Sequence, residues 1–213
     1  MQIKKLFIAL GIILPLHAQG QNLLVKDAPA TIDSYVNEFN SDDNELYKQD
    51  IPNCDAAEFL KENIPFFECP DKDLEKTYYF RWWTYRKHIK KTPEGFVISE
   101  FLPDVPWAGK YNTISCAANH HFYEGRWLKD SRILSDYASF WFSGGGTPRL
   151  YSFGAADAIY NYYLIHNDKA LLNDLYPKLK NNFAKWEQEK QDSTGMFWQT
   201  DDRDGMEMSV SGR

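Results

Sequence analysis

The sequence lacks an excess of positive charge. It carries 24 lysine and arginine residues against 30 aspartate and glutamate residues, which gives a formal net charge of -6 at pH 7. Nucleic acids and anionic membranes attract basic surfaces, so this balance argues against either as a partner. After the first twenty residues the sequence also lacks an apolar run near the ~20 residues that a membrane span needs, and no span is expected.

Cysteines are few, and their spacing does not indicate a metal site. None of Cys54, Cys69 and Cys116 forms the close Cys-x-x-Cys pair of a zinc or redox centre. Cys54 and Cys69 flank a short helical segment and could close a small loop, whereas Cys116 is expected to be a buried thiol. The three glycines at 144–146 lack the Lys-Ser/Thr of a phosphate-binding loop and are expected to end a helix. We therefore expect neither a metal nor a cofactor.

The first twenty residues have the layout of a secretory signal peptide. Lys4 and Lys5 precede an apolar run from Leu6 to Leu16, and the small-residue pattern Ala18-Gln19-Gly20 follows. We expect residues 1–20 to be removed and the protein to be exported, to the periplasm or the outside of the cell. Residues 21–50 are then expected to form a polar lead before the main domain.

The remaining chain is dominated by helical periodicity, with apolar side chains at steps of three and four. The pattern predicts helices over 55–63, 71–91 and 112–129, and three more around 133–141, 156–163 and 172–186. The predicted apolar stripe is Ile133, Tyr137, Phe140 and Trp141 in the fourth of these helices, and Ala156, Ile159, Tyr160 and Tyr163 in the fifth. In the second helix the shared face holds Leu74, Tyr78, Trp82, Tyr85 and Ile89. Asp71 or Asp73 is expected to cap that helix, Gly95–Ile98 is a candidate strand, and Pro177 could interrupt the last helix. Short and long loops alternate, as in stacked helical hairpins.

One helix flank combines polar and aromatic side chains suited to a sugar. Because successive residues of an α-helix are rotated by 100° about its axis, one flank holds His120, Glu124 and Trp127. This flank lies beside the apolar stripe that holds His121. Such a flank can bind hydroxyl groups and stack on a sugar ring. The alternatives are that His121 is a core histidine and that Glu124 is ordinary surface charge. His120 and Glu124 could also be two ligands of a metal ion, but the sequence offers no recognisable third ligand.

A second dense polar segment, residues 199–207, holds four carboxylates within seven positions. It could be a solvated acidic loop, but Trp198, Met206 and Met208 are unusual in such a loop. Glycoside hydrolysis needs a carboxylic acid that stays protonated near neutral pH, which apolar or anionic neighbours favour. Glu207, between two methionines, is the candidate general acid.

Four segments give the chain a resemblance to a known family. They are residues 79–83 (YFRWW), 100–112 (EFLPDVPWAGKYN), 119–128 (NHHFYEGRWL) and 149–158 (RLYSFGAADA). They resemble the six-hairpin glycosidases of exported bacterial polysaccharide-degrading systems, which are similar to trehalase and mannosylglycerate-hydrolase-like catalytic domains. The Gly-Trp-Asp-x-Ser-x-Arg context of the trehalase acid is similar to residues 205–213 here, with Glu207 in place of the aspartate.

The resemblance implies an all-α fold, a partial (α/α)6 toroid of helical hairpins with short β segments in the loops. A complete toroid has twelve helices, so residues 51–213 are expected to be an N-terminal half. The implied activity is inverting hydrolysis of an oligo- or polysaccharide without a metal, with Glu207 as acid and a general base located beyond Arg213. The residues expected to bind substrate are Arg81, Trp82, Trp107, His120, Glu124, Asp157, Trp198 and Asp204. This chain alone is expected to have little activity and an apolar edge on which the missing half docks.

Two other functions remain open from the sequence. Helical toroids also occur in polysaccharide lyases, and Asn119, His120 and Tyr123 could neutralise a uronate and abstract a proton. A non-catalytic glycan-binding protein is the other alternative.

Overall fold

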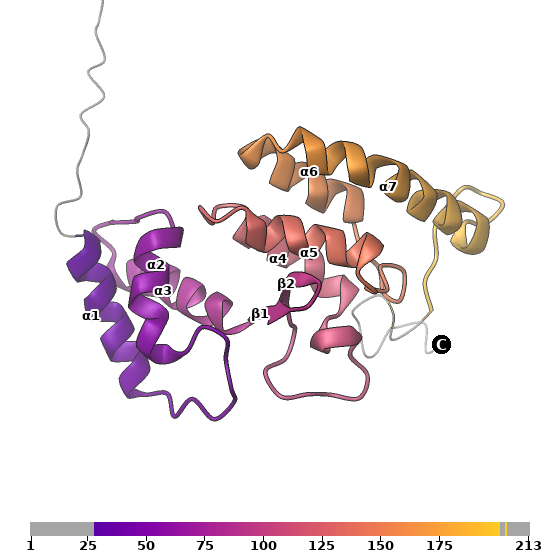
Figure 1. Ribbon diagram of the computed structural model, residues 1–213. Coiled ribbons are helices and arrows are strands. Elements are labelled where there is room, and N and C mark those ends of the chain that lie inside the picture. Colours follow the sequence, from indigo (N-terminus) through magenta and orange to yellow (C-terminus); the bar gives the residue numbers. More distant parts are fainter. Residues whose placement is uncertain (1–27, 201–202, 204–213) are drawn as a thin grey trace, which may run out of the picture.

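The computed structural model describes residues 28–200 and 203. The chain forms a row of packed helices, with α1, α2 and α3 at one end, α4 and α5 in the middle, and the α6 and α7 hairpin at the other end (Figure 1). A two-stranded hairpin lies between the first group and the middle (Figure 1). The fold is the all-α arrangement of helical hairpins with short β segments that the sequence predicts.

The first helix lies within the segment that the sequence analysis treats as a polar lead. Helix α1 (Ala28–Ser41) buries Ala28, Ile32, Val36 and Phe39, at steps of four, four and three. These side chains pack against α2 (Ala56–Asn63), which follows the short 3-10 helix η1 (Asn53–Asp55), and against α3. The periodicity is present in the sequence, but most of the positions between carry polar or acidic residues.

Helix α3 (Lys72–Lys87) begins where the sequence predicts and ends earlier. The Asp71 side chain accepts hydrogen bonds from the amides of Asp73 and Leu74, each at 3.1 Å, which confirms the predicted cap. Instead of continuing to Lys91, the chain leaves the helix at His88 and forms strand β1 (Ile89–Thr92).

Strand β1 pairs antiparallel with β2 (Gly95–Ile98), so the predicted strand exists and has a partner that the sequence analysis placed in a helix. Gly95 has a φ of 102°, a backbone conformation that residues with a side chain rarely adopt. Its α-carbon lies against Asp136, whose carboxylate accepts the amide proton of Phe96 at 3.1 Å. This contact fixes the hairpin on α5 (Arg132–Ser143).

The second half of the chain is helical apart from its loops. Helix α4 (Ser115–Gly125) follows the 3-10 helix η2 (Lys110–Asn112) and packs against α6 (Ala155–His166), while α5 packs against α7 (Lys169–Lys190). The predicted stripe of α5 is fully buried. Pro177 lies inside α7 without interrupting it.

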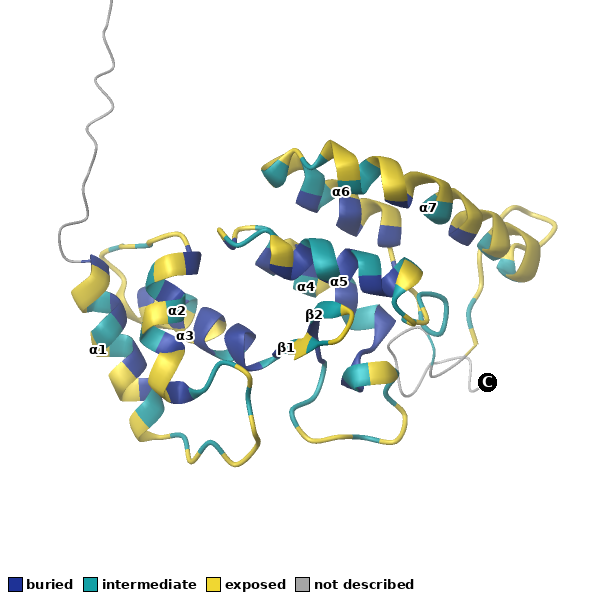
Figure 2. Ribbon diagram, in the orientation of Figure 1, coloured by how far each residue is buried: buried dark blue, intermediate teal, exposed yellow. Residues whose placement is uncertain are grey.

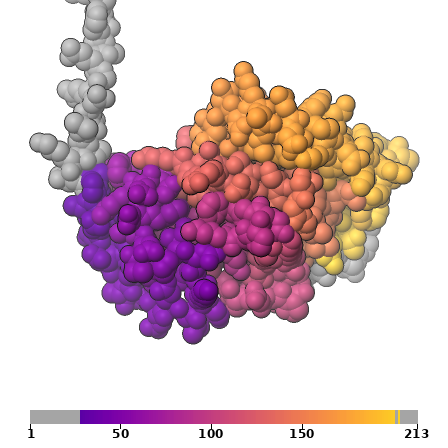
Figure 3. All heavy atoms as spheres, viewed as in Figure 1, coloured from indigo at the N-terminus to yellow at the C-terminus, as the bar shows by residue number. Residues whose placement is uncertain are grey.

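The buried faces of these elements form one core that runs along the row. Figure 2 shows buried residues on the inner sides of the helices and mostly exposed residues along α7. The space-filling view in Figure 3 shows the N-terminal helices packed directly against the middle of the chain. The core is rich in aromatic rings: Tyr137, for example, stacks on Phe122 and contacts Trp141 edge-on.

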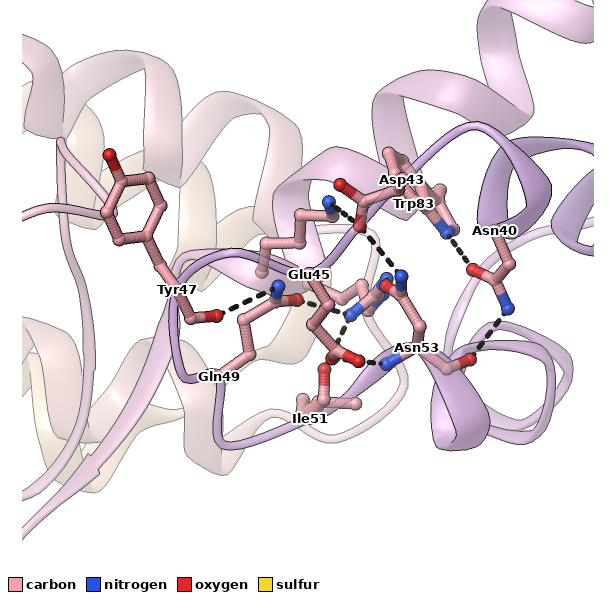
Figure 4. A network of polar contacts seen from close by, with 10 residues as sticks. Asn40, Asp43, Glu45, Tyr47, Gln49, Ile51, Asn53 and Trp83 are labelled. Carbon is pink, nitrogen blue, oxygen red and sulfur yellow. Dashed lines mark hydrogen bonds and ion pairs between the residues drawn. The ribbon is translucent and has the colours of Figure 1, made fainter.

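A network of polar contacts fastens the loop between α1 and η1, with Gln49, Ile51 and Asn53 among its members labelled in Figure 4. The buried Arg86 bonds to all three. The guanidinium donates to Gln49 Oε1 at 2.7 Å, to the Ile51 carbonyl at 2.6 Å and to Asn53 Oδ1. Burial lowers the pKa of Arg86 to about 10, although nearby carboxylates, Glu45 first, oppose the shift. Charge-assisted bonds therefore hold the loop, in addition to the packing of Ile51 against the core.

The structure also describes the three cysteines, the possible metal ligands and the longest helices. Cys54 and Cys69 are free thiols, which donate to Asp55 Oδ1 and to the Asp71 carbonyl, so the small disulfide loop is not formed. Cys116 is half-buried. In the described part of the chain, no three His, Cys, Asp or Glu side chains are grouped as metal ligands, and no helix is long and apolar enough to span a membrane.

Candidate functional site

A polar cavity of about 410 Å³ lies between α3 and α4, next to the end of β2. Its volume is within the usual range of small-molecule sites. Its lining combines two glutamates, three histidines and an arginine with aromatic and apolar side chains: Phe80, Arg81, Thr84, Tyr85, His88, Ile98, Glu100, Ala117, His120, His121 and Glu124.

Helical periodicity explains why these residues meet. On α3 the lining residues Arg81, Thr84 and Tyr85 recur at three and four positions, and on α4 Ala117, His120 or His121, and Glu124 do the same. Each helix therefore presents one flank to the cavity. Glu100 comes from the segment after β2 and closes a third side.

Arg81 and Glu124 form a bidentate pair across the cavity. Arg81 Nε donates to Glu124 Oε1 at 3.2 Å and Nη2 donates to Oε2 at 2.6 Å. The Arg81 side chain is 63% exposed and that of Glu124 is 23% exposed. The two-point geometry orients both groups, although solvent limits what such a pair adds to stability.

A second polar chain starts at Glu100. Its Oε2 lies 3.3 Å from His121 Nε2, and His121 Nδ1 lies 3.1 Å from the hydroxyl of Tyr137. Burial raises the pKa of Tyr137, which stays a neutral phenol at neutral pH. His121 is thus held between a buried hydroxyl and a cavity carboxylate, so this histidine, expected in the core, also borders the cavity.

The third histidine, His88, connects the cavity to the β hairpin. Its Nδ1 lies 2.9 Å from the Ser99 carbonyl, and the amide of Ser99 donates to the His88 carbonyl at 2.9 Å. Burial lowers the pKa of His88, which favours the neutral imidazole. The backbone next to Glu100 is consequently fixed on α3.

Of the residues predicted to bind substrate, Arg81, His120 and Glu124 meet in this cavity. Trp82 does not: it is 4% exposed and packs edge-on against Tyr78 and Tyr85 in the core. Its place on the apolar stripe of α3 already indicated burial. Trp107 is 58% exposed in the loop after β2, where it contacts Phe101 edge-on.

Asp157 and Trp198 lie elsewhere. Asp157 accepts a hydrogen bond from the Tyr123 hydroxyl and borders a second cavity of about 450 Å³, lined mostly by apolar side chains of α6, α7 and Phe197. Trp198 is half-exposed under the ammonium of Lys190, which lies 3.9 Å from the ring centre. The candidate acid Glu207 and the candidate binding residue Asp204 lie outside the described residues.

The residues of the lyase alternative do not gather in one place. His120 lines the cavity between α3 and α4. Asn119 packs against Gly154 at the start of α6, and Tyr123 is bonded to Asp157 of the same helix. Helix α4 therefore directs these side chains to two different neighbours.

Sequence reasoning missed two of the charged or titratable groups of the cavity, Glu100 and His88. His88 follows Arg81 by seven positions within the helix predicted over 71–91, so helical spacing was an available signal for it. Glu100 reaches the cavity from outside the helices, through the β hairpin, and its one signal was its place at the start of a segment that carries the family resemblance.

Residues 110–213 match the family model of the mannosylglycerate hydrolase MGH1-like glycoside hydrolase domain. A solved structure named "Sialidase" is similar over 86% of this chain, with 40% sequence identity and a TM-score of 0.82. The chain spans 18% of the length of that solved protein. No curated protein matches. The resemblance to glycoside hydrolases is thereby confirmed, by the family model over residues 110–213 and by the solved structure over 86% of the chain.

Proposed function

We propose that this chain is part of an exported glycoside hydrolase that cleaves O-glycosidic bonds of an oligo- or polysaccharide with inversion. The observation that carries the proposal is the match of residues 110–213, which include Glu207, to a glycoside hydrolase domain. Glu207 is proposed to donate the proton to the leaving oxygen. Asp204 is proposed to bind the substrate beside it.

The cavity between α3 and α4 is the proposed place of one sugar residue. Its carboxylates can accept hydrogen bonds from hydroxyl groups, and the exposed ring of Phe80 offers an apolar face for the C–H side of a sugar. In an inverting enzyme a second carboxylate activates water about 6.5–9.5 Å from the acid. The family resemblance implies that this base lies outside the present sequence, so the proposal includes little or no activity for the 213-residue chain alone.

The test replaces Glu207 by glutamine in the longest protein that carries this sequence. Turnover of natural glycosides is expected to fall by at least ~10²-fold, because the leaving oxygen loses its proton donor. Aryl glycosides with acidic leaving groups need less protonation and are expected to lose much less. Proton NMR of the first product is expected to show the anomer opposite to that of the substrate.

The matched control is Glu187→Gln, the same change at an exposed position of α7. It is expected to leave turnover unchanged. Equal turnover in the wild type and the Glu207 variant would refute the assignment of the acid, and a product of retained configuration would refute inversion.

A further inference from the structure

We propose that the cavity between α3 and α4 selects an uncharged sugar residue and rejects sugar acids such as sialic acids and uronates. This inference rests on the proposed function, since it names the class of substrate for the same cavity. The juxtaposition that carries it is an arginine already engaged by one glutamate, with a second glutamate facing the same space.

Recognition of a sugar carboxylate requires an available cation, usually the two-pronged guanidinium of an arginine. Among the residues that line the cavity, Arg81 is the one lysine or arginine. Both Nε and Nη2 already donate to the two carboxylate oxygens of Glu124, at 3.2 and 2.6 Å. An acidic sugar would have to displace Glu124 to use the same donors.

The other charges of the cavity also oppose an anion. Glu100 and Glu124 both line the cavity, whereas Arg81 can balance only one of them. Burial lowers the pKa of His88, which favours the uncharged form of this histidine. His121 lies 3.3 Å from Glu100 and adds a cation only when it is protonated. His120 lines the cavity as well and, like His121, is a cation only when protonated. Where these imidazoles are neutral, a carboxylate ligand would therefore meet a like charge without a free counter-charge, which is an effective way to exclude a competing ligand.

An uncharged sugar finds suitable partners in the same place. The oxygens of Glu100 and Glu124 can accept hydrogen bonds from hydroxyl groups, and such bonds to ionised acceptors are the stronger kind. Thr84 and His120 add polar groups that can donate or accept. Phe80, which is 44% exposed, supplies an apolar ring at the edge.

Sugar binding to the full 213-residue chain tests the inference by NMR. Neutral hexoses are compared with N-acetylneuraminic acid and glucuronic acid at about pH 8, where imidazole groups are generally uncharged. We expect at least one neutral hexose to shift the amide signals of Arg81, Glu100 and His121 in a saturable way, and the two acids to leave them unchanged.

The variant Glu124→Gln releases Arg81 while preserving the shape of the side chain. We expect its affinity for the sugar acids to rise about tenfold or more, because a free guanidinium becomes available and a negative charge is removed. The control Asp174→Asn makes the same charge change on α7, where Asp174 pairs with Lys178, and is expected to show no gain. A thermal melt confirms that both variants are folded.

Three results would overturn the inference: tighter binding of an acid than of every neutral hexose by the wild-type cavity, no binding of any sugar there, or no gain in folded Glu124→Gln. Hydrolysis is measured separately with the longest protein. A protein that binds neutral sugars but cleaves nothing would refute the proposed function alone, and one that cleaves glycosides but prefers acids would refute this inference alone.

Discussion

Replacing Arg86 by methionine removes the centre of the network that holds the loop between α1 and η1. The side chain is 0% exposed and its guanidinium donates to Gln49, Ile51 and Asn53. Methionine fills much of the volume but leaves these three acceptors without a donor. Hydrogen bonds to a charged group contribute about 1.5–3 kcal/mol each, and the cost of burying the guanidinium offsets a large part of that.

The expected net loss is about 3–4 kcal/mol of the free energy of unfolding, the usual range when one partner of a buried charged network is removed. For a chain of this size it corresponds to a melting temperature roughly 6–16 °C lower. Urea unfolding followed by tryptophan fluorescence measures the loss, with a folded baseline recorded for each variant, because the Arg86 guanidinium lies 5.1 Å from the centre of the Trp83 ring and its removal can itself change the signal.

Arg132→Met provides the matched control. Arg132 also forms a bidentate pair, with Asp130 at 2.9 and 2.7 Å, but its side chain is 74% exposed. Its replacement is expected to cost less than about 1 kcal/mol. If Arg86→Met is as mild as Arg132→Met, burial is not what makes the Arg86 network important and the reasoning fails.

Two further predictions concern stability. Gly125→Ala places a methyl group 2.1 Å from the hydroxyl of buried Tyr85, whose hydrogen bond to the His121 carbonyl is then lost. The free energy of unfolding, followed by a thermal melt, is expected to decrease by about 1–3 kcal/mol. An unchanged melt would contradict this packing. The second stability prediction concerns Glu75, which is 2% exposed. Burial alone would raise the pKa of this carboxyl group. Hydrogen bonds from Lys72, the Cys69 amide and Tyr35 outweigh burial and lower the pKa below 4.5. Because the pKa of Glu75 is lower in the folded than in the unfolded protein, its carboxylate stabilises the fold at a pH above the unfolded-state pKa. This contribution is lost as the pH falls through the folded-state pKa. The free energy of unfolding, measured from pH 6 to pH 3, is therefore expected to decrease, and to decrease less in Glu75→Gln.

The sequence predicted the helices whose apolar positions are dense. The stripe of Ile133, Tyr137, Phe140 and Trp141 is buried as a unit in α5. In α6 the predicted stripe is displaced, since Ala155, Ala158, Ile159 and Tyr162 are buried while Tyr160 is 52% exposed. Aromatic residues on both sides of that helix made the two faces look alike.

Local pattern failed where long-range contacts decide the structure. Residues 89–92 continue the periodicity of α3, but pairing with β2 and the contact of Gly95 with Asp136 turn them into a strand. Helix α1 was missed because its apolar residues are sparse and are buried only by α2 and α3.

In the candidate site, too, the residues placed by helix geometry were predictable and those placed by long-range contacts were not. His120 and Glu124 were recognisable because helix geometry alone places them on one flank, and Arg81 joins them by pairing with Glu124. Glu100 was not recognisable as part of the site, because its position depends on the β hairpin and on the loop that follows. Trp82 was assigned to the pocket for its chemistry, although its own stripe placed it in the core.

That loop depends on a single side chain. Asn112, which is buried and has a φ of 63°, donates from Nδ2 to the carbonyls of Phe101 and Pro103 at 2.6 and 2.7 Å, and its Oδ1 accepts from the amide of Val105 at 3.1 Å. Its own carbonyl accepts the amide proton of Glu100 at 2.9 Å. The Asn112 side chain thus holds the two arms of the loop together, and residues 106–108 lie outside its hydrogen bonds. Substitution of Pro106 or Ala108 therefore offers a way to reshape the surface beside Trp107 without moving Glu100 at the base of the loop.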